Sequence, residues 1–315
     1  MKERTLALVA LAAVCLFWGT TYLAIRLAVN DLPPALFCAV RFAIAGAAML
    51  ALSLARGERL PRDRDWFDLA VVAVLLLAVG NGTLAWALRW VPTGVASLII
   101  VTTPLWMASF AWLGGENVRA RTLAGLLLGF VGLSFVLWPK IETAQPGSHF
   151  IEGAGAILAS SAVWALGSVY SKKRAPRTAP LMSAAVQMLM GSGLFAVVGL
   201  SLGEPARWHA TSTSWFAVAY LVLFGSIVGY GSYIYALAKL PTAQVAVYAY
   251  VNPLVAILLG ISFLGEPFEP SMRLGVPLVL LGVFLVNTHG AAPTAADTAL
   301  PLRVRLLRRL WGRSA

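Results

Sequence analysis

Long apolar stretches separated by short polar segments make up nearly the whole chain. Those long enough to be membrane spans cover residues 6–29, 35–55, 68–90, 94–113, 122–138, 153–171, 180–202, 215–237, 243–263 and 273–289. A hydrocarbon core about 30 Å thick needs roughly 20 apolar residues per helix. Backbone groups in lipid must be hydrogen-bonded within the protein, so each span is expected to be a helix. The pattern predicts an all-α integral membrane protein with ten transmembrane helices.

The second half of the chain repeats the first. Residues 87–105 and 236–254 are identical at six of nineteen positions. Prolines and a Gly-Glu pair recur at matching places, which are Pro92, Pro104 and 115–116 in the first copy and Pro241, Pro253 and 265–266 in the second. Each copy has five spans, an odd number, so the second copy enters the membrane upside down. Two inverted five-helix repeats are typical of secondary transporters.

The cations are distributed unevenly over the loops. Of the 24 lysines and arginines, 18 lie in segments on the side of the N-terminus and four on the other side. The positive-inside rule then places both termini in the cytoplasm. We predict a first repeat at residues 1–140, a second, inverted repeat at 150–290, and a basic cytoplasmic tail at 291–315 that lies on the membrane surface as an amphipathic helix.

Composition agrees with this interpretation. The chain is 59% hydrophobic and 12% charged, with a mean hydropathy of +0.80, whereas soluble domains carry about 25% charged residues. The net charge of +11 follows from the cytoplasmic segments, so no nucleic-acid partner is expected. Cys15 and Cys38 fall inside spans and are expected to be small buried residues rather than a disulfide.

Short motifs occur in a fixed order along both halves. They are Trp18-Gly19-Thr20-Thr21-Tyr22, Arg41-Phe42, Gly80-Asn81-Gly82, Pro92-Thr93, Pro104 and Gly115-Glu116, then Trp164-Ala165-Leu166-Gly167-Ser168, Ala236 to Pro241, Tyr250-Val251-Asn252-Pro253 and Gly265-Glu266. The ordered set resembles the EamA branch of the drug/metabolite transporter superfamily, and most of all its YedA-like members. The resemblance implies a multi-pass carrier of the bacterial inner (plasma) membrane that exports small metabolites, amino acids or drugs. It implies no single substrate.

Two prolines lie at matching depths near the middle of their spans. Pro104 and Pro253 each remove a backbone donor and displace the carbonyl four residues earlier. Irregular backbone in a membrane is tolerated where it is buried in protein or lines a wet cavity. We predict a hinge or kink at both prolines, serving either helix packing or a substrate cavity.

Polar and aromatic side chains at helical spacing are the candidates for the wall of that cavity. Trp18 and Tyr22 are four residues apart and share a helix face, as do Trp164 and Ser168. The alternative for the aromatics is helix packing or an interfacial belt. The predicted cavity residues are Trp18, Tyr22, Asn81, Trp86, Thr102, Thr103, Trp164, Ser168, Tyr230, Tyr248 and Asn252.

Charges within the predicted spans are few. No aspartate or glutamate lies near the middle of a span, which argues against proton coupling through a buried carboxylate and favours facilitated diffusion or exchange. The cations inside spans are Arg26 and Arg41. Either Arg26 reaches the surface while Arg41 caps carbonyls or pairs with Asp31, or the two bind a substrate carboxylate. The sequence leaves both interpretations open.

The predicted function is a secondary transporter, with export of small metabolites such as amino acids by alternating access around a central cavity. Export of drug-like compounds or organic anions is an alternative, and a channel or a membrane-embedded enzyme is a distant one. No catalytic residues, metal ligands or cofactor are predicted, because no paired acids or metal-ligand spacing occurs. The expected partners are a small-molecule substrate and membrane lipid. Glycines in two spans predict close helix packing or a homodimer surface, namely Gly125, Gly129, Gly132, Gly275 and Gly282.

Overall fold

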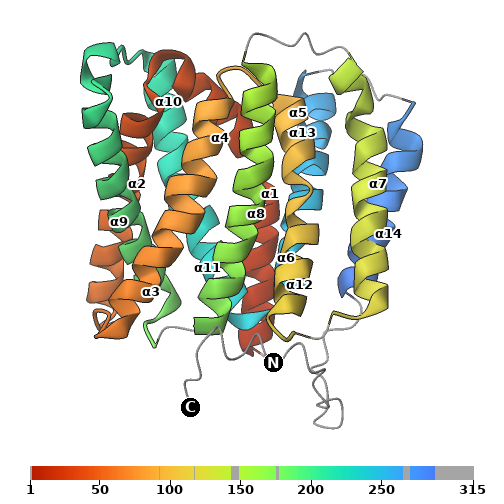
Figure 1. Ribbon diagram of the computed structural model, residues 1–315, viewed down its shortest axis with the longest axis horizontal. Helices are drawn as coiled ribbons and strands as arrows, with labels where there is room; N and C mark the ends of the chain where they lie inside the picture. Colours follow the sequence, from red (N-terminus) through yellow and green to blue (C-terminus); the bar gives the residue numbers. More distant parts are fainter. Residues whose placement is uncertain are drawn as a thin grey trace.

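The protein is an all-helical bundle. The computed structural model describes residues 2–91, 93–116, 118–142, 149–174, 177–264 and 270–287. Within these residues every regular element is a helix (Figure 1). Among the described residues, seven helices are long and apolar enough to cross a membrane. This confirms an all-α membrane protein, while the exact count of ten spans stays a prediction. Pro92, the pair at 265–266 and the predicted tail at 291–315 lie outside the described residues.

The helices follow one another in the order of the predicted spans. The first half contains α1 (Lys2–Asp31), α2 (Pro34–Ala55), a third segment made of α3 (Arg64–Val72), the π-helix η1 (Ala73–Asn81) and α4 (Gly82–Ala87), a fourth made of α5 (Thr93–Ile100) and α6 (Thr103–Leu113), and α7 (Ala120–Glu142). The second half contains α8 (Phe150–Arg174), α9 (Pro180–Ser201), the 3₁₀ turn η2 (Glu204–Arg207), a segment made of α10 (Ser212–Tyr220), the π-helix η3 (Leu221–Tyr230) and α11 (Gly231–Lys239), another made of α12 (Thr242–Ala246) and α13 (Tyr248–Leu264), and α14 (Met272–Asn287).

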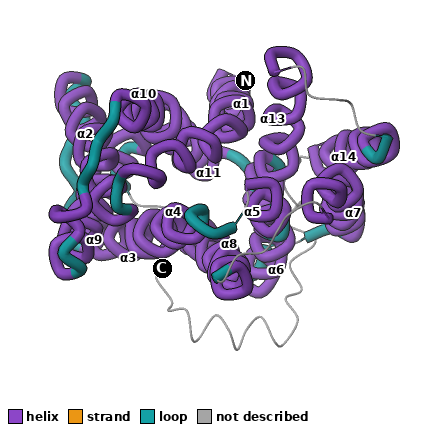
Figure 2. The backbone as a smooth tube through the Cα atoms, turned by 90° about the horizontal axis from the view of Figure 1, so that it is seen from above, coloured by secondary structure: helices purple, strands orange, loops and turns teal. Residues whose placement is uncertain are grey.

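Helices from the two halves pack against each other throughout the bundle. At one end α2 lies along α9, and at the other end α7 lies along α14 (Figure 2). Between them α1 packs against α13, η3 and α11, while α8 packs against α6, η1 and α4. The two halves therefore form one body, with α1 and α8 at its centre.

Glycines allow the close contact of α7 with α14. A Cβ added at Gly125 would lie 2.8 Å from the carbonyl oxygen of Gly282, and one at Gly132 equally close to the carbonyl oxygen of Gly275. Gly129 instead faces the ring of Tyr250. The predicted close packing thus joins two helices of the same chain. A homodimer surface stays a prediction.

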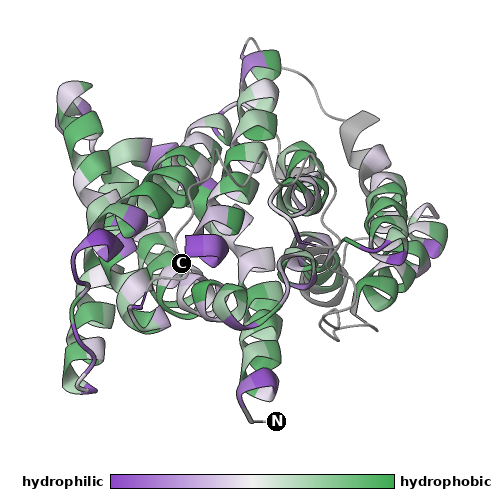
Figure 3. Ribbon diagram, turned by 60° about the horizontal axis from the view of Figure 1, so that its bottom comes forward, coloured by the Kyte–Doolittle hydropathy of each residue, from purple (hydrophilic) through white to green (hydrophobic). Residues whose placement is uncertain are grey.

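The bundle has two polar ends. Figure 3 shows hydrophobic residues along the helices and hydrophilic residues mostly near their ends. We call the end that holds the start of α1 the N-terminal face, and the end where α1 stops at Asp31 the opposite face. At the N-terminal face, Asp68 accepts a hydrogen bond from Tyr170 at 2.5 Å, and Lys239 pairs with Glu3 at 3.2 Å. These contacts tie α3 to α8 and α11 to α1.

At the opposite face a buried glutamate caps α2. Glu204 is 3% exposed, and its Oε2 accepts a hydrogen bond from the backbone N–H of Leu36 at 2.8 Å. The first N–H groups of a helix lack partners within it, and a carboxylate there is also favoured by the helix dipole. Glu204→Ala is expected to lower the free energy of unfolding by about 1–3 kcal/mol, since it leaves a buried donor unpaired. Thermal unfolding in detergent measures this. Glu152→Ala, at a carboxylate that is 67% exposed, is the control and should unfold like the wild type.

Candidate functional site

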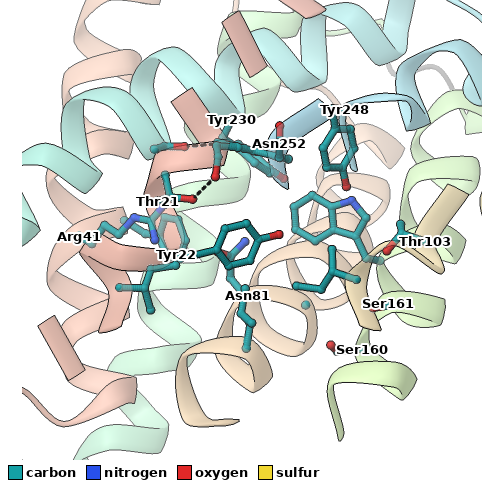
Figure 4. A pocket seen from close by; sticks show the side chains of 18 residues that line it. Thr21, Tyr22, Arg41, Asn81, Thr103, Ser160, Ser161, Tyr230, Tyr248 and Asn252 are labelled. Atoms are coloured by element: carbon teal, nitrogen blue, oxygen red, sulfur yellow. Dashed lines mark hydrogen bonds between the residues drawn. The ribbon is translucent and has the colours of Figure 1, made fainter. Parts of the chain in front are cut away.

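A cavity lies in the middle of the bundle, between helices of both halves (Figure 4). It has about 80 Å³ accessible to the centre of a water molecule. A single water needs roughly 10–15 Å³ on this measure, so the cavity has room for several waters or a small solute. Tyr22 and Ile25 near the end of α1, and Leu84 near the end of α4, line it. The cavity therefore lies in the half of the bundle nearer the opposite face.

The cavity wall contains most of the predicted site residues. The predicted residues that line it are Trp18, Tyr22, Asn81, Thr103, Trp164, Tyr230, Tyr248 and Asn252, together with Arg41. They come from seven segments that are far apart in the sequence. The fold thus gathers at one place the side chains that the sequence singled out separately.

Three predicted residues do not line the cavity. Trp86 is 37% exposed and packs edge-on against Trp90, with ring centroids 4.7 Å apart. The hydroxyl of Thr102 donates to the carbonyl of Ile99 at 2.7 Å, at the break between α5 and α6. Ser168 is fully buried beside the aromatic rings described below. Ser168 shares a face of α8 with Trp164 but lies one turn further from the cavity, whereas Trp86 and Thr102 contact residues outside it.

Other lining residues were not predicted. They are Thr21, Ile25, Phe42, Gly80, Leu84, Ile100, Ser160, Ser161 and Gly225. Helical spacing from Trp18 could have indicated Thr21 and Ile25, which lie three and seven residues further along the same face. No comparable signal marks Gly225, because a glycine contributes only backbone to the wall.

Four aromatic side chains form the floor of the cavity, and we call them the aromatic layer: Trp18, Trp164, Tyr233 and Tyr248. The Trp18 ring centroid lies 5.6 Å from that of Trp164 and 5.2 Å from those of Tyr233 and Tyr248. Trp164 Nε1 donates to the Tyr233 hydroxyl at 3.1 Å, and this hydroxyl lies 2.5 Å from Ser168 Oγ. Offset and edge-to-face aromatic contacts are favourable, and the polar atoms of Trp18, Trp164 and Tyr233 have hydrogen-bond partners. The layer is therefore a well-ordered barrier below the cavity.

Both tryptophans of the aromatic layer pack against a glycine in a π-helix of the other half. A Cβ added at Gly80 in η1 would lie 2.6 Å from Trp164 Cε3, and one at Gly229 in η3 would collide with Trp18 Nε1. Trp18 Nε1 also donates to the carbonyl oxygen of Gly225 at 3.0 Å. Short π-helical segments are frequent at functional sites. Here they bring the backbone close enough to the indole rings to hold them in the cavity floor.

Arg41 is a buried cation at the cavity wall. It is 4% exposed, its Nε donates to Ser226 Oγ at 2.8 Å, and its guanidinium carbon lies 4.9 Å from the Phe42 ring centroid. No carboxylate of the described residues forms an ion pair with it. Among the described residues Asp31 forms no ion pair with Arg41 and accepts a hydrogen bond from Thr211 at 2.5 Å. A buried guanidinium whose other N–H groups have no hydrogen-bond partner among the described residues is suited to bind a carboxylate.

Arg26 has a different environment. It does not line the cavity, and its guanidinium donates to the backbone carbonyl of Leu88 at the end of the third segment. A guanidinium that bonds a backbone carbonyl outside the cavity fits a structural role for Arg26 better than a role in substrate binding. The two arginines within the predicted spans thus have separate surroundings.

The two prolines differ in their local structure. Pro104 follows a break in the helix, because α5 ends at Ile100 and α6 begins at Thr103. Pro253 lies inside α13, which continues through it from Tyr248. Beside it the buried Asn252 is placed to donate from its amide nitrogen to the carbonyls of Cys15 and Tyr248, at 2.9 and 3.0 Å. Asn252 therefore links α13 to α1 at the cavity.

The remaining polar groups of the wall are hydroxyls and one amide. Thr21, Ser160 and Ser161 donate to carbonyls in their own helices, at 2.8–2.9 Å, which leaves their oxygens as acceptors. The side chain of Asn81 lines the cavity, and its backbone belongs to η1. None of the described lining residues is acidic. The wall therefore combines one cation with neutral polar groups and aromatic faces.

Comparison with known proteins agrees with this geometry. The sequence profile of the EamA-like transporter family matches the chain twice, over residues 5–138 and 151–288. The chain belongs to the EamA-like transporter family. The two matches fall in the two halves of the bundle, and each half supplies part of the cavity wall. The family resemblance seen in the motifs is confirmed.

Relatives of this EamA-like transporter cover nearly its full length. The Escherichia coli protein named "Uncharacterized inner membrane transporter YedA" is 35% identical over 279 residues, which cover 88% of this chain and 89% of that one. The Bacillus subtilis "Uncharacterized transporter YvbV" is 29% identical over 297 residues, covering 94% and 95%. A crystal structure that is 24% identical matches with a TM-score of 0.75 over 89% of this chain and 96% of its own, and shows the shared fold. The protein is thus a multi-pass inner-membrane transporter.

Proposed function

We propose that this EamA-like transporter is a carrier for a small solute that bears a carboxylate, such as an amino acid. The observation that carries the proposal is Arg41, a buried guanidinium at the cavity wall with no acidic partner among the described residues. A substrate carboxylate would pair with it, while an ammonium group would lie against the faces of Trp18 and Tyr248. An organic anion without an ammonium group is the second candidate, because the same arginine favours it.

Inverted repeats are supported by local features that recur in both halves. Helices α2 and α9 both begin at a proline and both contain 22 residues, 146 positions apart. The π-helices η1 and η3 fall in corresponding segments. The contact of Gly80 with Trp164 is matched by that of Gly229 with Trp18, with the halves exchanged. A two-fold relation between the halves accounts for all three features.

Alternating access is supported by the position of the cavity. The cavity lies toward the opposite face, and the aromatic layer separates it from the N-terminal face. Contacts such as Asp68 with Tyr170 then hold the N-terminal face closed. Rocking of the halves would open that face and close the other. The distribution of cations favours a cytoplasmic N-terminal face. Movement of a solute from that face to the opposite face is then export from the cell.

Counterflow in proteoliposomes tests the proposal. Vesicles are preloaded in turn with neutral amino acids, with succinate and with an organic cation, and uptake of the labelled solute is measured. We expect counterflow with the amino acids or with succinate, and none with the cation, because the wall holds a cation and no described acid. Cation counterflow would contradict the assignment of a carboxylate solute, and passive flux without any counterflow would contradict the carrier assignment.

A further inference from the structure

A second cavity lies at the N-terminal face, between α8, α9 and α11. It has about 270 Å³ accessible to the centre of a water molecule. Its lining residues, which define what we call the N-face pocket, are Ser171, Lys172, Thr178, Pro180, Ser183, Gln187, Ile234, Leu237, Ala238 and Lys239. The pocket is separate from the central cavity, and the two share no lining residue. Substrate binding in the central cavity does not account for the N-face pocket.

The polar wall of the N-face pocket consists of hydrogen-bond donors and contains no acid among its described residues. Two lysines, three hydroxyls and one amide face it. Lys172 donates to the carbonyl of Leu240, and the acidic residue that acts on its charge, Glu116, does not line the pocket. Lys239 pairs at 3.2 Å with Glu3, whose side chain is 78% exposed, so this pair is screened by water. Thr178 donates to Asp65 at 2.9 Å, outside the lining. The pocket is therefore complementary to an anion.

Gln187 lies at the inner end of the pocket. It is 0% exposed, and its Oε1 accepts a hydrogen bond from the Tyr230 hydroxyl at 2.7 Å. Its Nε2 has no hydrogen-bond partner within the described part of the chain. A buried amide donor left unpaired is unfavourable, so this nitrogen is a site that a ligand oxygen would satisfy. Tyr230 itself lines the central cavity, so one hydrogen bond joins the walls of the two cavities.

The repeat places this pocket opposite the arginine site. With the spacing of 146 residues between α2 and α9, Gln187 corresponds to Arg41, and Ser171 corresponds to Ile25. Arg41 and Ile25 line the central cavity, whereas Gln187 and Ser171 line the N-face pocket. Gln187 at the N-terminal face is therefore the counterpart of Arg41, which lies toward the opposite face.

We infer that the N-face pocket is a second binding site, on the far side of the aromatic layer, for the carboxylate of the transported solute. This inference rests on the carrier function proposed above. Gln187 Nε2 and the ammonium groups of Lys172 and Lys239 bind the carboxylate oxygens. A solute bound there contacts Gln187, which accepts the hydrogen bond of the Tyr230 hydroxyl. It occupies the N-terminal half of the pathway, while the closed aromatic layer separates it from the central cavity.

Binding of radiolabelled succinate to the full-length protein in phosphatidylcholine nanodiscs tests the inference. The Arg41→Gln protein is used throughout, so that only a site other than the arginine is measured. We expect this protein to bind succinate. Adding Gln187→Glu should weaken binding at least tenfold, because it replaces the Nε2 donor by a carboxylate oxygen and keeps an oxygen for Tyr230. Adding Lys172→Gln should weaken binding similarly.

Lys173→Gln is the matched control, since Lys173 is next to Lys172 in α8 and does not line the pocket. It should bind like the Arg41→Gln parent. Absence of succinate binding to Arg41→Gln, or unchanged binding in Gln187→Glu, would overturn the inference. Displacement of succinate by added phosphatidylglycerol would overturn it too, by showing that the pocket holds a lipid headgroup. Loss of wild-type counterflow with this binding intact would count against the carrier function alone.

Discussion

Replacing Arg41 by glutamine is expected to reduce counterflow of the preferred carboxylate solute by roughly 10- to 100-fold. A hydrogen bond to a charged group contributes about 1.5–3 kcal/mol, and about 1.4 kcal/mol corresponds to a factor of ten. Glutamine keeps a donor for Ser226 and removes a buried charge that has no ion-pair partner among the described residues. The protein should therefore fold and insert normally. Counterflow in proteoliposomes at equal protein content measures the effect.

Two variants separate binding from structure at this position. Arg41→Lys keeps the charge and loses the planar fork, so we expect transport between that of the wild type and of Arg41→Gln. Arg26→Gln removes the other arginine, whose guanidinium contacts a backbone carbonyl outside the cavity, and should leave solute affinity unchanged. Full transport by Arg41→Gln would show that Arg41 is structural and that the carboxylate binds elsewhere.

Adding a methyl group at Gly229 or Gly80 is expected to impair both stability and transport. In Gly229→Ala the new Cβ meets the Trp18 indole, and in Gly80→Ala it meets the Trp164 indole at 2.6 Å. The glycines lie in π-helices that pack directly on these rings, so the ring or the helix must move. Overpacking of this kind costs about 1–3 kcal/mol. We expect a lower unfolding temperature in detergent and a lower rate of counterflow for both variants.

A third glycine, Gly155, provides the control for these two variants. A Cβ added at Gly155 in α8 meets nothing within 4 Å, so Gly155→Ala should be as stable and as active as the wild type. Equal effects at Gly155 and Gly229 would show that loss of backbone flexibility, rather than contact with Trp18, is responsible. A stable and fully active Gly229→Ala protein would contradict the tight packing of η3 on the indole.

The two helical repeats were predictable because they appear as short patterns in the sequence. Apolar stretches of membrane length indicate helices whatever their neighbours are, and the recurring prolines at 92, 104, 241 and 253 reveal the duplication. Trp18 and Tyr22 could be assigned to one face because helical geometry fixes the direction of side chains four residues apart. Deep tryptophans and tyrosines with polar ends were expected near the centre, because in lipid each polar end needs a partner.

Other features depend on contacts between distant segments. Trp86 resembles Trp18 in the sequence but faces outward and packs on Trp90. Tyr233 is central to the aromatic layer because α11 brings it against Trp164 and Ser168. Pro104 and Pro253 are equivalent in the sequence, yet only the first directly follows a helix break. Contacts between segments and the local course of the backbone, and not the composition of each helix, decided these cases.

By itself the sequence determined the helical membrane class, the duplication, the family and half of the residues that line the central cavity. The helical class and the shared helix faces follow from hydrophobicity and spacing, which are local properties, the duplication follows from comparing the two halves, and the family follows from the resemblance of the ordered motifs. The tertiary structure alone decided that Arg41 has Ser226 rather than Asp31 as its partner, that Gly80 and Gly229 hold the tryptophans, and that Gln187 joins a second cavity. These depend on how helices far apart in the chain rotate and approach each other, because packing acts between segments that no short pattern connects.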